Sequence, residues 1–150
     1  MNIKEKIEQL HTNKEFDVFY PKDYTVAVFP NTATMGAAQK ALLMAGWTAN
    51  NIIQFSGAEF LAWHEENNQD KGPLEKLQST IAELIGQETE YLKDFLMLAQ
   101  QDHEFLTIYT PTAEDDQHVV ETLKPFKPVK LTDYQAGGLV DLDIVQTRPV

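Results

Sequence analysis

The amino-acid sequence predicts an α+β fold, a ferredoxin-like sandwich in which two inserted helices separate two βαβ units and an N-terminal helical arm precedes them. Short apolar, β-branched runs alternate with helical patterns in the order βαβ–αα–βαβ. The two βαβ units have similar lengths, and neither has a glycine-rich loop between strand and helix. A flavodoxin-like parallel sheet is the alternative. It normally needs about five regularly alternating strands, and the chain offers four good ones.

The composition is that of an ordinary globular protein. The chain has 150 residues, 43% hydrophobic and 23% charged, and a chain of this length buries about 70% of its unfolded surface. The absence of cysteine excludes disulfides, zinc–thiolate sites, iron–sulfur clusters and thiol nucleophiles. The first twenty residues contain no apolar signal core, and no run reaches membrane-spanning length. We therefore expect a cytoplasmic protein with no membrane partner.

The charge distribution argues against nucleic-acid binding. The formal net charge is −11, and Arg148 is the only arginine. Residues 1–58 are balanced in charge, whereas residues 59–104 carry eleven acids against three lysines. No basic patch of the kind that binds phosphate backbones is present, so we expect no nucleic-acid partner.

Local patterns predict the arm and the first βαβ unit. Residues 2–12 place apolar side chains at helical spacing, and residues 13–24 form a charged, aromatic arm broken by a proline. The apolar, β-branched run 24–29 predicts strand one. A helix over 34–45 and a second strand over 51–55 complete the unit.

Two helices are expected between strands two and three, a short one over 57–68 and a long one that begins at Pro73. The long helix carries a seam with 3-4 spacing, which consists of Leu74, Leu77, Ile81, Leu84, Glu88, Tyr91, Phe95 and Leu98. Residues 74–101 would span about 42 Å as a helix. We expect a homodimer that forms through this helix or through the sheet. The alternative is that both helices fold back and cover the sheet.

The second βαβ unit repeats the order of the first. Strand three is predicted over 104–110, a helix over 111–124 with Thr112 as its N-cap, and strand four over 128–134. Residues 139–145 alternate apolar and acidic side chains and form either a fifth, edge strand or a partner-binding tail. A single domain, 1–150, is thus divided into an N-terminal arm (1–24), the first βαβ unit (25–56), the helical insertion (57–102), the second βαβ unit (103–135) and a tail (136–150).

The stretch VFPNTATMGAAQKALLMAGW, residues 28–47, has the layout of a phosphate-binding loop, with a strand, a polar turn and a helix N-terminus. Such a loop normally uses glycines and a lysine, but this turn contains Pro30, while Gly36 and Lys40 lie inside the helix. The polar residues of the turn either cap the helix or bind a ligand: Asn31, Thr32 and Thr34. Gly46 and the aromatic residue after it predict a Schellman-type helix ending.

Further candidates would line a ligand site between the sheet and the inserted helices: Trp63, His64, Glu88 and Tyr91. A metalloprotease helix needs a second histidine four residues after His64, and Asn68 stands there, so we expect no metal site. Glu88 is a carboxylate on an otherwise apolar seam; it is either buried with a raised pKa, as an acid/base group would be, or solvated or paired. No Ser-His-Asp order or G-x-S-x-G elbow is visible, so we expect no catalytic residues and no cofactor.

Two segments resemble the YflT-like general stress protein family. TVAVFPNTATMGAAQKALLMAGWTANNIIQFSG (25–57) is similar to the family's first βαβ unit, with an alanine-rich helix that ends in AG plus an aromatic residue. FLTIYTPTAEDDQHVVETLKPFKPVKLTDY (105–134) is similar to its closing unit, with an acidic helix start. The resemblance implies a ferredoxin-like domain with a stress-related role and no catalytic residues to carry over. The arm, the inserted helices and the tail depart from that family.

From these features we expect a non-enzymatic protein that oligomerises, as a homodimer, and acts as a stress-related or regulatory module. The alternative is a small-molecule-binding protein or enzyme, with its site between the sheet and the inserted helices.

Overall fold

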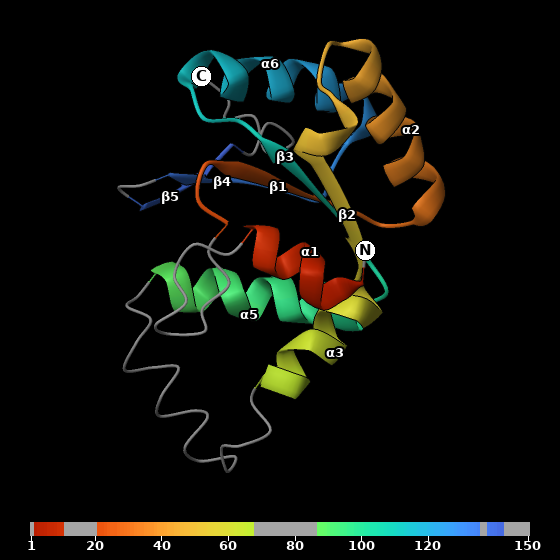
Figure 1. Cartoon of the computed structure of the whole chain (residues 1–150), viewed down its shortest axis with the longest axis vertical. Coiled ribbons are helices and arrows are strands. Elements are labelled where there is room, and N and C mark those ends of the chain that lie inside the picture. Colours follow the sequence, from red (N-terminus) through yellow and green to blue (C-terminus); the bar gives the residue numbers. More distant parts are fainter. Residues whose placement is uncertain (1, 11–20, 68–86, 136–137, 143–150) are drawn as a thin grey trace.

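The computed structural model describes residues 2–10, 21–67, 87–135 and 138–142. They form a mixed α+β fold in which a five-stranded sheet lies between two layers of helices (Figure 1). All neighbouring strands run antiparallel, which excludes the parallel flavodoxin-like alternative. The strands are β1 (Tyr24–Phe29), β2 (Ile52–Ser56), β3 (Glu104–Tyr109), β4 (Lys130–Gln135) and β5 (Gly138–Asp141), in the spatial order β2–β3–β1–β4–β5.

The helices of the described residues are α1 (Ile3–Leu10), α2 (Thr32–Met44), α3 (Gly57–Asn67), α5 (Gln87–Gln100) and α6 (Ala113–Leu123), with 3-10 turns η1 (Ala49–Asn51) and η2 (Lys124–Phe126). Away from the long helix and the tail, the predicted elements agree with these bounds within about two residues. Helix α5 is the second half of the predicted helix 74–101, and residues 68–86 lie outside the described residues. Strand β5 pairs with β4, so this part of the tail forms the edge strand.

The sheet interleaves the two βαβ units. Strand β3 lies between β1 and β2 and runs antiparallel to both, so the first unit is split by a strand of the second. Strand β1 in turn lies between β3 and β4 and splits the second unit. Each unit therefore stabilises the other through backbone hydrogen bonds along β1 and β3.

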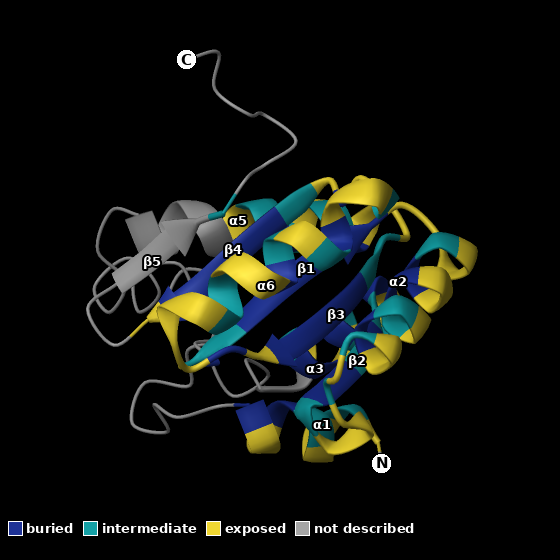
Figure 2. Ribbon diagram, turned by 90° about the horizontal axis from the view of Figure 1, so that it is seen from above, coloured by how far each residue is buried: buried dark blue, intermediate teal, exposed yellow. Residues whose placement is uncertain are grey.

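Both faces of the central strands are buried, which explains why β1 is almost uniformly apolar and shows little alternation. Helices α2 and α6 cover one face and contact a core that includes Ala27 and Leu106. Helices α1, α3 and α5 cover the other face, which carries Val26 and Phe105 (Figure 1). In Figure 2 the central strands are buried and the exposed residues lie on the outer sides of the helices. The inserted helices thus fold back over the sheet in the described part of the chain.

Aromatic rings hold the inserted helices against the sheet. The ring of Phe105 in β3 stacks on Phe55 of β2, with centroids 5.3 Å apart and planes 12° apart. It also contacts Phe60 of α3 at 5.4 Å and Phe95 of α5 at 5.8 Å. All four side chains are fully buried. Each such pair adds about 0.5–1.5 kcal/mol to the free energy gained by burying the rings.

Gly57, the first residue of α3, packs directly against the end of α5. Its N–H donates to the backbone oxygen of His103 at 2.8 Å. A Cβ at this position would lie 2.5 Å from Ala99 O and 2.8 Å from Ala99 Cα. Because both are backbone atoms, no side chain can move aside, and only glycine lets the two helices approach this closely.

We expect Gly57→Ala to lower the free energy of unfolding by about 1–3 kcal/mol, because it forces α3 away from α5. Gly36→Ala is the matched control: a Cβ there meets nothing within 4 Å, so the same change in α2 should stabilise the protein by about 0.5–1 kcal/mol. Urea denaturation followed by circular dichroism measures both. Equal stability of Gly57→Ala and the wild type would contradict the packing seen here.

Candidate functional site

The candidate site begins at the C-terminal end of α2. Gly46 follows the helix with a φ of +114°, a conformation that glycine adopts without strain. Its N–H donates to the backbone oxygen of Leu43 at 3.3 Å, and the N–H of Trp47 donates to that of Leu42 at 3.1 Å. These two bonds confirm the predicted Schellman ending, and they fix the backbone of Trp47 just beyond the helix.

The indole of Trp47 connects α2 to two other elements. Its Nε1–H donates to the backbone oxygen of Tyr109, the last residue of β3, at 3.2 Å. Its ring lies against the imidazole of His118 in α6, with centroids 4.5 Å apart and planes tilted by 35°. The indole is half-buried, so contacts from three elements hold a ring that still presents surface to solvent.

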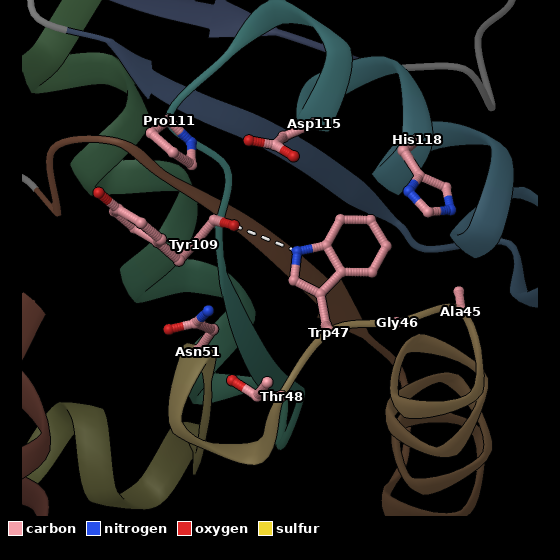
Figure 3. Close-up of a pocket in the computed structure, with 9 residues that line it drawn as sticks. All are labelled: Ala45, Gly46, Trp47, Thr48, Asn51, Tyr109, Pro111, Asp115 and His118. Carbon is pink, nitrogen blue, oxygen red and sulfur yellow. Dashed lines mark hydrogen bonds between the residues drawn. The ribbon is translucent and has the colours of Figure 1, made fainter.

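A pocket of about 340 Å³ opens beside this indole. It is lined by Ala45, Gly46, Trp47, Thr48, Asn51, Tyr109, Pro111, Asp115 and His118. Figure 3 shows the Trp47 indole next to the backbone oxygen of Tyr109 and the side chain of Asp115 on the same side, while the Tyr109 ring points away from the indole. That ring lies 5.3 Å from the ring of Tyr24. The volume lies at the lower end of the range of about 300–1,000 Å³ found for small-molecule sites.

Asp115 is held in place by the start of α6. The hydroxyl of Thr112 donates to Asp115 Oδ2 at 2.8 Å, and the N–H of Asp115 donates back to Thr112 Oγ1 at 3.2 Å. This capping box confirms Thr112 as the predicted N-cap. The carboxylate of Asp115 therefore lines the pocket in a position that is set before any ligand binds.

A second cluster of polar groups lies under the same end of α6. Asp133 of β4 is only 1% exposed, and its Oδ2 accepts a hydrogen bond from Gln135 Nε2 at 2.7 Å. The Thr110 hydroxyl lies 3.5 Å from Asp133 Oδ1 and 2.7 Å from the hydroxyl of Thr25. The carboxyl group of Asp116, from the first turn of α6, approaches this cluster from above the sheet.

The carboxyl group of Asp116 has a raised pKa. Burial is the largest cause that raises the pKa of Asp116, to about 7, and hydrogen bonding to Asp133 and repulsion by its charge follow. The Thr110 hydroxyl opposes the shift, and the charge of Asp115 adds to it. When protonated, Asp116 can donate to the Asp133 carboxylate and join α6 to β4. Once both are ionised, the two carboxylates repel each other.

The polar turn before α2 serves as a helix cap. Asn31 Oδ1 accepts from the N–H of Thr34 at 2.8 Å, which confirms the capping interpretation for Asn31. The Thr32 hydroxyl donates to Glu104 Oε1 at 3.1 Å, so the turn also contacts the start of β3. The Trp47 pocket is not lined by Asn31, Thr32 or Thr34.

The other residues expected in a site lie on the inserted helices. Trp63 of α3 is buried in the core, and its ring lies 5.8 Å from that of Phe60. His64, the next residue of the same helix, is half-buried. Glu88 and Tyr91 belong to the first turns of α5, and their side chains lie outside the described part. Since α2 and α3 cover opposite faces of the sheet, the structure places the 31–34 turn apart from Trp63 (Figure 1).

The sequence reasoning did not single out four of these residues: Tyr109, Asp115, His118 and Asp133. The first three come together with Trp47 only because β3 and α6 pack beside α2, and no local pattern encodes that contact. Asp133 did leave a signal, because it is an acid inside the predicted strand 128–134, where charged residues are rarely buried.

Within the described ranges, no three histidine, aspartate or glutamate side chains are grouped so that they could hold a metal ion. No helix of those ranges is both long and apolar enough to cross a membrane. Comparisons with protein-family models, with curated proteins and with solved structures found no match.

We expect Asp116→Asn to stabilise the protein at pH 8 and to have little effect at pH 4. The pKa of Asp116 is about 7 in the folded protein against 3.8 ordinarily, so the folded state binds more protons between these values. The free energy of unfolding therefore falls as the pH rises from about 4 to 7. The variant escapes this loss, so it should gain about 1–2 kcal/mol at pH 8, where solvent screens part of the repulsion.

Glu114→Gln is the control for this experiment, because it removes a charge from an exposed residue of the same helical turn. Thermal melts of both variants at pH 4, 6 and 8 separate a local carboxyl pair from a general charge effect. A parallel pH profile for Asp116→Asn and the wild type would show that the pKa of Asp116 is not raised.

Proposed function

We propose that this chain is a non-enzymatic, regulatory binding module of ferredoxin-like topology that takes a small molecule into the Trp47 pocket. The interleaved, antiparallel order of β2, β3, β1 and β4 supports that topology, because it is the arrangement of a split βαβ sandwich. Strand β5 and the layer of α1, α3 and α5 are additions to it.

The observation that carries the proposal is the fixed pose of Trp47. A half-exposed indole normally has freedom to turn, and binding a ligand against it costs the entropy of ordering it. Here the Schellman turn, the bond to Tyr109 O and the contact with His118 already order the ring. A ligand that stacks on it therefore loses less free energy on binding than it would on a mobile ring.

The chemistry of the lining favours binding over catalysis. The pocket contains no serine, cysteine or lysine that could act as a nucleophile. The Asp115 carboxylate is engaged with Thr112, and the imidazole of His118 lies against Trp47. Asp115 and His118 thus have structural contacts of their own, and no side chain of the lining is hydrogen-bonded to a base that would activate it.

A ligand screen by thermal shift tests the proposal. A compound present at 100 times its Kd should raise the free energy of unfolding by about 2.7 kcal/mol, which corresponds to a Tm shift of about 5–10 °C. Trp47→Leu should abolish the shift by removing one wall of the pocket, and His118→Ala should weaken it.

Met44→Gln is the matched control, because Met44 lies at the end of the same helix, is 82% exposed and does not line the pocket. Circular dichroism shows whether each variant is folded. If a metabolite panel leaves the Tm of the wild type unchanged, or if ligands stabilise Trp47→Leu as they do the wild type, the pocket is not the binding site.

The homodimer is a second proposal, now through the predicted helix 74–101, of which α5 is the described part, and not through a face of the sheet, because helices cover both faces of the central strands. Met97 of α5 supports it: this large apolar side chain is 56% exposed on a helix whose other face is buried. The stress-related role, the cytoplasmic location and the lack of a nucleic-acid partner stay predictions.

We expect sedimentation velocity to show a dimer whose dissociation constant rises about tenfold or more in Met97→Lys, because a charge would be buried in the contact. Met44→Lys places the same charge on α2 and should leave the dimer intact. A strict monomer at high protein concentration would remove the homodimer.

A further inference from the structure

We propose that the Trp47 pocket selects a small organic cation, an ammonium group on a compact apolar body. The assignment rests on the proposed function, since it names the class of molecule that the pocket would bind.

The indole of Trp47 offers an aromatic surface to a cation. The electron-rich face of an indole or phenol attracts an ammonium group within about 6 Å of the ring centre, most strongly for tryptophan. Trp47 lines the pocket with its indole, and Tyr109 faces it with its backbone oxygen, because the Tyr109 ring points away from the indole (Figure 3) and lies 5.3 Å from that of Tyr24.

The charged group that lines the pocket is acidic. Asp115 brings a carboxylate to the wall of the pocket, and no lysine or arginine lines it. Glu114 precedes Asp115 in the first turn of α6 and adds to the negative field. The capping box fixes the Asp115 carboxylate in place. A cation therefore meets an oriented anion beside the Trp47 indole.

An anion is the competing occupant, because helix N-termini attract negative groups. Two of the backbone N–H groups that would hold an anion are already engaged: Thr112 N donates to Asp115 Oδ2, and Asp115 N donates to Thr112 Oγ1. The N–H of Asp116 bonds to the Thr112 oxygen within the helix. The start of α6 thus presents carboxylates in place of free donors.

His118 gives a way to test the charge preference. Its ring lies 4.5 Å from that of Trp47, so a positive charge introduced there would compete with a ligand cation for the same indole. We expect His118→Lys to weaken cation binding more than His118→Gln does. A pocket that binds only by shape would respond to the two changes alike.

The experiment uses three probes of one shape: choline, its uncharged isostere 3,3-dimethylbutan-1-ol, and the anion 3,3-dimethylbutanoate. The protein has two tryptophans, so its spectrum contains two indole N–H signals, and Trp47→Phe assigns the one from Trp47. NMR titration of the full chain at constant ionic strength then gives a Kd for each probe.

We expect choline to shift the Trp47 signal saturably and to bind about three- to fivefold more tightly than the alcohol, with the anion weakest. Asp115→Asn should weaken choline binding by about fivefold. Glu114→Gln is the matched control, since it removes the same charge from the same turn outside the pocket, and it should change the Kd less than twofold.

Three other outcomes of the titrations would contradict the cation preference, the role of Asp115 or the proposed function. If the alcohol binds as well as choline, or if the metabolite panel yields only neutral or anionic ligands, the cation preference is wrong while the pocket remains a binding site. If Asp115→Asn and Glu114→Gln weaken choline equally, a general field and not Asp115 attracts the cation. If neither the probes nor the panel shift the Trp47 signal, the proposed function itself fails.

Discussion

The structure depends on one constraint, that the strand pair β1–β3 is buried on both faces. Every residue of β1 after Tyr24 is buried, and so are the four central residues of β3. A sheet with two apolar faces is stable in water only when a layer covers each face. The two βαβ units supply one layer, α2 and α6. The arm and the insertion supply the other, and the contact of Gly57 with Ala99 lets α3 and α5 lie close enough to do so.

The pocket is a consequence of how the first layer ends. Helix α2 packs its buried residues on β1 and β3, and this fixes where its C-terminus lies. Gly46 then turns the chain, so that Trp47 meets the end of β3 and the side of α6. The indole is thus a contact between the two units as well as a wall of the pocket. A substitution that shifts α2 on the sheet would move this wall, even without touching the pocket.

Local features of this fold were predictable from sequence, and the contacts between distant segments were not. The cap at Asn31, the capping box at Thr112 and the glycine ending at Gly46 each depend on a few consecutive residues, so composition and spacing identify them. The layer that α3 and α5 form was one of two alternatives, because an amphipathic helix packs equally well on a sheet or on another chain. The pocket joins residues from three segments, and Trp47 was recognised only as a packing residue because its partners Tyr109 and His118 follow much later in the chain.

The two polar features of α6 are linked by electrostatics. Asp115 faces the pocket, and its neighbour Asp116 faces Asp133. Burial and Asp133 are the main causes that raise the pKa of Asp116, and the charge of Asp115 adds to them. A cation that neutralised Asp115 would remove this contribution and lower the pKa of Asp116. Because Asp116 lies beside Asp133, the charge at the wall of the pocket and the contact between α6 and β4 belong to one electrostatic cluster.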